Sequence, residues 1–271
     1  MTRLSLGSVA LSAGLCLLGS GAAACDISIG DTGFNIGMAT NKATEAWTRT
    51  YAISPGGTFE VVNTNGQVEV LQGTGPKVEV SAEKIAKASS DEAAKDLLGK
   101  IEIVETVKPD AVRLETKTPK TFGSGGAEVK YTIKVPTGLR VRAGTTNGHI
   151  KLTGISNDVE ASTTNGGVNG EELSGTIDAS TTNGGVNLAL AKLGAGGLKA
   201  STTNGGVAVT VLTDTRANVS AHVTNGGLGV ENLNVVTTGE QNRRHLEGTL
   251  NGGGPPIELG TTNGGIRLTG K

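Results

Sequence analysis

The second half of the chain alternates apolar and polar residues on either side of a recurring Asn-Gly pair. Successive asparagines of this pair stand 18 or 21 residues apart, with a final gap of 38. An apolar residue or alanine stands four and six positions before each Asn, and an aliphatic residue stands three positions after it. A period of two on both sides predicts a strand, a turn and a second strand in every repeat. The asparagines are Asn147, Asn165, Asn183, Asn204, Asn225 and Asn263.

Two architectures fit these repeats. A meander of hairpins would use each Asn-Gly pair as a tight turn between paired strands. A β-solenoid of about 18 to 21 residues per coil would instead stack its coils about 4.8 Å apart, so that each Asn lies over the next. The close copying of the motif favours the solenoid, because stacked like side chains bond to one another and a meander gives no reason for the copying. The six asparagines are therefore predicted to form a structural turn ladder.

The region 54–138 is predicted to be rich in strands and to contain one helix. The residues around Asn65 follow the rule of the later repeats, and further alternating runs are separated by a proline and by the loop TPKTFGSGG. The segment SSDEAAKDLLGKIEI differs, because Ser90 or Asp91 can cap a helix whose apolar residues fall at helical spacing. Around Asn251 the repeat pattern fails, and LEGTLNGGGPPIEL is interpreted as an irregular turn interrupted by two prolines.

The first 24 residues have the features of a secretory signal peptide. A single arginine precedes an apolar, small-residue stretch that ends in AAA before Cys25. Because Cys16 lies inside this stretch, Cys25 would be the one cysteine of the mature chain, and AAAC resembles a bacterial lipobox. We expect Cys25 to be a lipid anchor. The alternative is ordinary cleavage after Ala24, which would leave a free thiol.

The predicted organisation follows from these patterns. Residues after Cys25 are polar and glycine-rich with no sustained period, which predicts a tether. No later segment is apolar enough over about 20 residues to span a membrane. The expected parts are a signal peptide over 1–24, a tether over 25–53, the strand-rich part over 54–138 and the solenoid over 139–271.

Several segments, taken in order, resemble one bacterial family. They are PGGTFEVVNTNGQVEV, the SSDEAAKDLL helix, YTIKVPTGLRVRAGTTNGHIKL and the closing LNGGGPPIELGTTNGGIRL. Over about residues 54 to 271 the chain is similar to the putative-adhesin domains of unknown function that are related to GIN head domains and to toast-rack domains. The resemblance implies an all-β fold, a single-stranded right-handed β-helix, at the cell surface or in the envelope. It implies no established activity.

Composition narrows the function classes. The formal net charge is -1 with acids and bases interspersed, so the chain lacks the basic footprint of a nucleic-acid-binding protein. The 43 glycines do not recur at every third residue, and 36% of the residues are hydrophobic, which excludes a collagen and argues against disorder. All the aromatic residues lie before residue 132. The C-terminal half is therefore expected to pack through aliphatic side chains, Ala and Thr.

Candidate chemistry is sparse along the chain. A metal site needs several converging ligands, and a glycosidase needs a pair of carboxylates across a cleft. The histidines fall at unrelated positions of the pattern: His149, His222 and His245. The acids of the repeats are scattered in the same way: Glu171, Glu172, Asp178, Asp214 and Glu231. No catalytic, cofactor-binding or metal-ligating residue is predicted.

A stripe of hydroxyl side chains is expected on the outer face of the repeats. Its members are Ser162, Thr164, Ser180, Thr182, Ser201 and Thr203. The stripe is interpreted first as a solvated strand face. The second interpretation is a docking surface for a protein or a glycan, and it ranks lower because this half lacks the aromatic platforms of most glycan sites.

We therefore expect a non-enzymatic protein of the bacterial envelope or cell surface. It would be an adhesin-like or scaffolding module, exported to the periplasm or surface and held to a membrane by its lipid anchor. Its partner is an unknown protein or glycan, with no cofactor and no nucleic acid. One alternative is an envelope-stress or regulatory partner that binds a membrane protein through the N-terminal half. A polysaccharide-active β-helix enzyme is a third reading.

Overall fold

The structure, a computed structural model, describes residues 26–30, 33–37, 41–119, 125–238 and 242–271. The chain divides into two compact units, residues 1–39 and residues 40–271. In the first unit, β1 (Asp26–Gly30) and β2 (Gly33–Gly37) pair as an antiparallel hairpin. The predicted signal peptide and Cys25 lie outside the described residues. Within the described residues, no helix is both long enough and apolar enough to cross a membrane.

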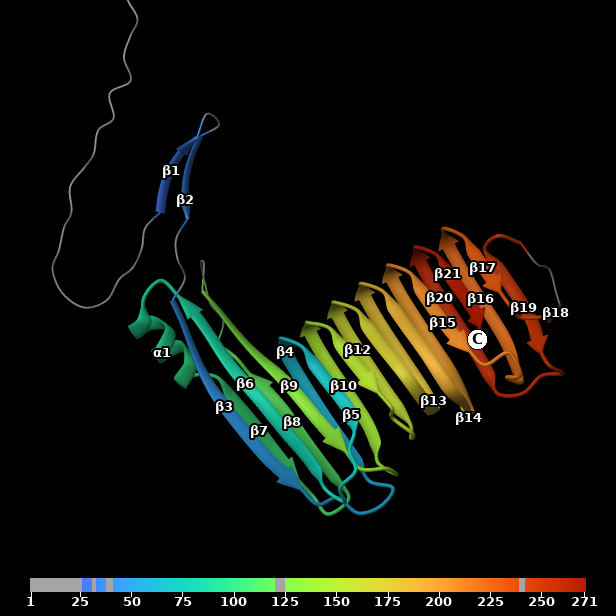
Figure 1. The fold of residues 1–271 in the computed structure, drawn as a ribbon, viewed down its shortest axis with the longest axis horizontal. Coiled ribbons are helices and arrows are strands. Elements are labelled where there is room, and N and C mark those ends of the chain that lie inside the picture. Colours follow the sequence, from blue (N-terminus) through green and yellow to red (C-terminus); the bar gives the residue numbers. More distant parts are fainter. Residues whose placement is uncertain (1–25, 31–32, 38–40, 120–124, 239–241) are drawn as a thin grey trace, which may run out of the picture. The chain divides into compact units, whose positions relative to one another are not determined.

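The second unit is all-β with one short helix, as the sequence predicts (Figure 1). Its N-terminal part contains β3 (Asn41–Tyr51), β4 (Thr58–Asn65), β5 (Val68–Gln72), β6 (Val78–Ala88), α1 (Asp91–Gly99), β7 (Glu102–Val107), β8 (Ala111–Lys117) and β9 (Gly126–Val135). Its C-terminal part contains β10 (Arg140–Asn147), β11 (Ile150–Thr153), β12 (Val159–Asn165), β13 (Val168–Asn183), β14 (Val186–Asn204), β15 (Val207–Val211), β16 (Ala217–Asn225), β17 (Leu228–Glu231), β18 (Val235–Thr237), β19 (His245–Leu250), β20 (Pro256–Asn263) and β21 (Ile266–Gly270).

The repeats stack in parallel, each strand pairing with the equivalent strand of the next repeat. Asn147 of β10 lies opposite Asn165 of β12, and Asn165 lies opposite Asn183 of β13. The strands after the asparagines follow the same rule, with Ile150 opposite Val168 and Val168 opposite Val186. These pairings run from repeat to repeat, which is the arrangement expected of stacked coils. Together the strands form a curled sheet (Figure 1).

The spatial order of the repeats differs from their order in the sequence. We name each repeat by its asparagine. On one edge the last repeat, Asn263, pairs in parallel with the Asn204 repeat through β14–β20 and β15–β21. On its other edge it pairs with the Asn225 repeat through β16–β20 and β17–β21. The C-terminal repeat is therefore inserted between two repeats that precede it along the chain.

The N-terminal part continues the same sheet. The Asn65 repeat pairs in parallel with the Asn147 repeat, β4 against β10 and β5 against β11. The boundary predicted between residues 138 and 139 thus falls within a single unit. Beyond the Asn65 repeat, β3, β6 and β9 pair antiparallel, and α1 contacts β3 and β6. As predicted, Ser90 caps α1, its hydroxyl accepting a hydrogen bond from the Ala93 amide at 3.2 Å.

The prediction of a tether as far as residue 53 is wrong for its last part. Asn41–Tyr51 form β3, which pairs along its whole length with β6. Most of the side chains of β3 are exposed or half-buried, and Tyr51 at its end is buried. The strand therefore lacks a regular apolar alternation, so the sequence pattern did not reveal it.

The core is aliphatic throughout the repeats, as predicted. The alternating inward positions bury Val159 against Ile177 and Ala161 against Ala179, and the other repeats follow the same pattern. Each fully buried Val, Ile or Leu stabilises the fold by about 1.5–3 kcal/mol relative to an exposed one. The small alanine side chains, four residues before the Asn in most repeats, add little bulk to the core there.

Each repeat turns sharply at its Asn and the glycine that follows, which we call the Asn corner. At Gly184 the φ angle is +155°, and an added Cβ would lie 1.9 Å from the carbonyl oxygen of Gly166 in the adjacent repeat. The next residue, Gly185, does not have a positive φ angle, and an added Cβ there would be 3.5 Å from the Gly206 carbonyl oxygen. The first glycine of the corner is therefore required by the close stacking of repeats, and the second is not.

We predict that Gly184→Ala lowers the free energy of unfolding by about 2 kcal/mol or more, because its methyl group collides with the neighbouring backbone. The matched control, Gly185→Ala, is expected to change it by less than about 0.5 kcal/mol. Urea unfolding followed by circular dichroism measures both values. Equal losses in the two variants would contradict the stacking that this structure shows.

Candidate functional surface

The asparagines of the Asn corners form one continuous line of hydrogen bonds. The side-chain amide of each Asn donates to the side-chain oxygen of its neighbour, at distances from 2.7 to 2.9 Å. All six predicted residues lie in this line, together with Asn65. The order in space is Asn65, Asn147, Asn165, Asn183, Asn204, Asn263 and Asn225. Each internal Asn both donates and accepts, so the line ties every repeat except the two at its ends to two others.

A second set of hydrogen bonds lies beneath the Asn corners. Thr181 is buried, and its hydroxyl donates at 2.8 Å to the carbonyl oxygen of Gly166 in the adjacent repeat. The equivalent threonines of four other repeats make the same bond, which is longest in the Asn147 repeat: Thr145, Thr163, Thr202 and Thr261. A buried carbonyl without a partner costs about 1–3 kcal/mol, so these hydroxyls have a structural use. The first Thr of the Thr-Thr-Asn-Gly-Gly motif thus faces inward.

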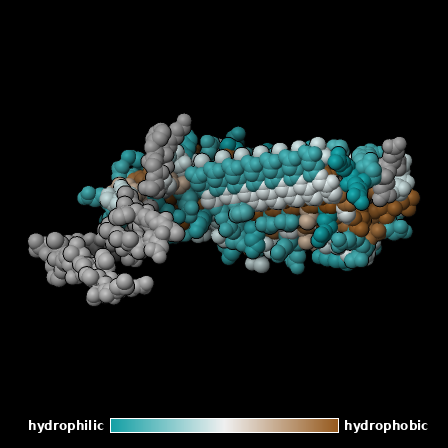
Figure 2. Space-filling view, turned by 90° about the horizontal axis from the view of Figure 1, so that it is seen from above, coloured by the Kyte–Doolittle hydropathy of each residue, from teal (hydrophilic) through white to brown (hydrophobic). Residues whose placement is uncertain are grey.

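The second Thr of the motif faces outward with the serine two positions before it. We call this outer surface the first face; it is made by the strands that precede the Asn corners. On it Ser162, Ser180 and Ser201 are opposite one another in successive repeats. Thr164, Thr182 and Thr203 are exposed. Figure 2 shows hydrophilic and near-neutral bands that run along the repeats.

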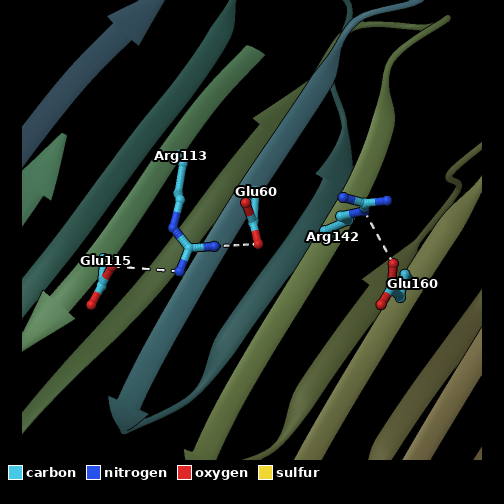
Figure 3. A network of polar contacts seen from close by, with 5 residues as sticks. All are labelled: Glu60, Arg113, Glu115, Arg142 and Glu160. Atoms are coloured by element: carbon cyan, nitrogen blue, oxygen red, sulfur yellow. Dashed lines mark hydrogen bonds and ion pairs between the residues drawn. The ribbon is translucent and has the colours of Figure 1, made fainter. Parts of the chain in front are cut away.

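A row of charged residues crosses the first face beside the serines. The row continues from strand to strand as Arg113, Glu60, Arg142, Glu160, Asp178, Lys199 and Glu258. Figure 3 shows its N-terminal part, in which Arg113 bonds both Glu60 and Glu115. Arg142 pairs with Glu160 at 3.0 Å, and both side chains are more than half exposed. Exposed pairs contribute about 0–1 kcal/mol to stability, so this row adds little to the fold.

A shallow depression of about 250 Å³ opens on the first face at Gly144. Gly144 stands between Val62 and Ser162 in the row that is serine in the next repeats. An added Cβ at Gly144 would approach no atom closer than 3.8 Å, so neither the backbone nor the packing requires glycine there. Arg142 and Glu160 line the depression. The sequence signal for it, a glycine where the next repeats have serine, was too small to predict it, since Gly260 is a second glycine in the same row.

The structure brings two of the three histidines together. Antiparallel pairing of β16 with β19 sets His222 opposite His245, with ring centroids 6.2 Å apart, and His245 lies 3.3 Å from Glu247. His149 is remote from them and accepts a hydrogen bond from the Gly167 amide at 2.9 Å. The contact of His222 with His245 could not be predicted from the spacing of the repeats, because β19 belongs to the irregular segment around Asn251. Even so, the described residues contain no group of three His, Cys, Asp or Glu side chains placed to hold a metal ion.

The acids of the repeats do not converge on a cleft. Glu171 and Glu172 are adjacent and exposed, with Glu172 in the left-handed region at a φ of 54°. Glu231 pairs with Arg267 at 3.5 Å. Asp178 lies in the charged row of the first face, and Asp214 is exposed after β15.

A polar cluster in the N-terminal part surrounds Tyr51. Its hydroxyl bonds Glu105 at 2.5 Å, and Arg49 both pairs with Glu105 at 3.2 Å and lies 4.9 Å from the centre of the Trp47 ring. Burial, followed by the bond to Glu105, raises the pKa of Tyr51 well above its usual value. Burial also raises the pKa of Tyr131 to about 12. Both phenols therefore keep their protons at neutral pH and serve as hydrogen-bonding groups.

We predict that Asn165→Ala costs about 1–3 kcal/mol of unfolding free energy, because it removes two side-chain hydrogen bonds. Asn225 lies at the end of the line and has one such bond, so Asn225→Ala should cost about half as much. Thermal and urea unfolding of the two variants measure the difference. A stably folded Asn165→Ala protein that loses partner binding would contradict a structural role for the line.

The family model of the Toastrack DUF4097 domain matches residues 57–269. A search of curated proteins finds no match. Among solved structures, the chain is similar to a putative cell adhesion protein from Clostridium sporogenes ATCC 15579, with 13% identity, coverage of 84% of this chain and 100% of that one, and a TM-score of 0.43. It is also similar to a putative adhesin from Bacteroides fragilis NCTC 9343, with 15% identity, coverage of 83% and 97%, and a TM-score of 0.37.

The family match covers most of the second unit, from just before β4 to the next-to-last residue of β21. It confirms the resemblance seen in the sequence. This chain belongs to the Toastrack DUF4097 family.

Proposed function

We propose that the protein is an exported, non-enzymatic module that attaches to a partner through its first face, in the manner of an adhesin or a scaffold. The observation that carries the proposal is the first face itself. It crosses seven adjacent strands in one register, and its outer rows of hydroxyls and charges contribute little to the fold. A broad polar surface suits binding to another surface better than it suits catalysis in a cleft.

The depression at Gly144 is the proposed centre of this surface. A partner group can approach the backbone there, because no side chain stands between Val62 and Ser162. Glu60 and Glu160 offer acceptors, and Arg142 offers donors, on one side of the depression. This mixture of donors and acceptors suits hydroxyl-rich or amide-rich groups, as in a glycan or a polypeptide.

The proposal extends to the path of the chain, which we infer to be a right-handed β-solenoid. The parallel pairing of like strands at spacings of 18 and 21 residues supports this path. A solenoid extends its binding surface by adding repeats, each of which contacts its neighbours. An elongated platform of this kind is useful for adhesion or scaffolding.

Binding is tested by filling the depression without disturbing the sheet. We expect Gly144→Gln to lower binding of the purified protein to surfaces coated with mucin, fibronectin or bacterial polysaccharide by at least tenfold. The matched control is Gly260→Gln, since Gly260 occupies the same row and an added Cβ there is 3.9 Å from Ser201. Circular dichroism checks that both variants fold. If the unchanged protein binds and Gly144→Gln binds equally well, the depression is not the binding site.

We also propose that Cys25 carries the lipid that holds the protein to a membrane. The AAAC sequence supports this, together with the position of Cys25 directly after the signal-like stretch. Cells that express the protein and are fed labelled palmitate should incorporate the label into it, and Cys25→Ser should abolish incorporation. Label that persists in Cys25→Ser would remove the anchor from this account.

A second candidate function has one observation in its favour. Trp47 is half-buried on β3, with Arg49 over its ring, and aromatic and Arg residues are enriched at the energetic centres of protein interfaces. In this candidate function the chain is an envelope-stress or regulatory partner, and a membrane protein docks at this cluster of the N-terminal half. Co-purification of one membrane protein that depends on Trp47 and not on Gly144 would favour this candidate over adhesion.

A further inference from the structure

The C-terminal repeat, residues 255–271, lies between the Asn204 and Asn225 repeats, which precede it along the chain. We call the space that it fills the slot. Its backbone bonds the Asn204 repeat through the Gly205 amide and the Asn263 carbonyl at 2.9 Å. It bonds the Asn225 repeat through the Gly264 amide and the Asn225 carbonyl, also at 2.9 Å. The Asn263 side chain donates to Asn204 and accepts from Asn225, at 2.9 Å in both cases. The segment is thus bonded along both of its edges.

The slot is apolar on its inner side. Ile257, Leu259, Ile266 and Leu268 of the C-terminal repeat are buried, with exposed fractions of 3% or less. They pair in register with Leu198 and other aliphatic residues of the flanking repeats. Without this segment, the Asn204 and Asn225 repeats would each present an open strand edge to any chain with a matching pattern.

The segment that leads into the slot is built like a hinge. Asn251, Gly252 and Gly253 all have positive φ angles, of 49°, 84° and 83°, and two prolines follow them. The Asn251 amide holds this turn by bonding the carbonyl oxygens of Thr213 and Thr215 at 3.0 and 2.8 Å. Asn251 is the non-glycine residue of this turn in the left-handed region, where a side chain stores strain, whereas the two glycines adopt positive φ freely and allow the chain to change direction. A short hinge under strain favours the exchange of an element between identical chains.

We propose that two copies of this chain can exchange their C-terminal repeats, each filling the slot of the other. The occupant is a second copy, because residues 255–271 already match the slot in register, in apolar pattern and in the Asn line. The repeat of a second copy competes for the slot with the chain's own C-terminal segment. That segment is tethered to the slot and has an effective concentration of the order of millimolar. Exchange therefore occurs while chains fold together at high concentration, before residues 255–271 have inserted into the slot of their own chain.

The experiment uses the full chain with Cys16→Ser and Cys25→Ser, so that introduced cysteines are the only thiols. An added Cβ at Gly260 lies 3.9 Å from the Cβ of Ser201, within the range of about 3.5–4.5 Å that a disulfide needs. Chains carrying Ser201→Cys are mixed with chains carrying Gly260→Cys, unfolded together in urea, refolded at high concentration and oxidised. Mass spectrometry and non-reducing gels measure the covalent dimer that contains one chain of each kind.

Exchange predicts a covalent dimer at least fivefold above a control mixture in which Gly229→Cys replaces Gly260→Cys. Gly229 is exposed and belongs to β17, which pairs with β21. The double variant Ser201→Cys/Gly260→Cys checks the geometry, because it should form the disulfide within one chain. If the double variant closes its disulfide while the mixture stays at the level of the control, exchange between chains is excluded. A double variant that folds without forming its disulfide would also overturn the proposal, since the pairing of the slot would then be wrong.

Discussion

The stacking of one Asn corner on the next is the constraint on which the rest of this structure depends. Repeats stand one strand spacing apart, which leaves no room for a side chain on the first glycine of the corner, as the distance of 1.9 Å at Gly184 shows. That spacing in turn brings the asparagine amides within hydrogen-bonding distance and places the Thr181 hydroxyl on the Gly166 carbonyl. Register, core and surface rows all follow, because each residue lies beside its equivalent.

The same constraint explains how a surface built from nearly identical repeats can still contain a local feature suited to binding. Because the register fixes every outward position, a single change of residue creates a local feature in an otherwise uniform face. Gly144 opens a depression between Val62 and Ser162, in a row that is serine in the next repeats, and the charged row combines acidic and basic residues from strand to strand. The proposed binding surface therefore arises from small departures from the repeat, and the repeat itself supplies the rigid support.

Much of this fold can be predicted from the alternating pattern, and the failures have physical causes. The inward Val159 and Ala161, the Ser90 cap and the aliphatic core follow from local rules of periodicity and capping. The place of the Asn263 repeat does not, because any repeat with the same pattern fits the same edges and local rules do not order them. β3 was not predicted, because its mostly exposed and half-buried side chains show no regular apolar alternation. The contact of His222 with His245 was not predicted either, because it depends on antiparallel pairing in a segment without the repeat pattern.

The Asn263 repeat lies between the Asn204 and Asn225 repeats, and magnetic coupling between spin labels on the exposed threonines of these repeats measures that order directly. Labels at Thr203 and Thr262 should be about 4.8 Å apart at the backbone, whereas labels at Thr203 and Thr224 should be about twice that distance. This order predicts stronger dipolar broadening for Thr203 with Thr262 than for Thr203 with Thr224. Stronger broadening for Thr203 with Thr224 would mean that the repeats stack in sequence order, and would contradict it.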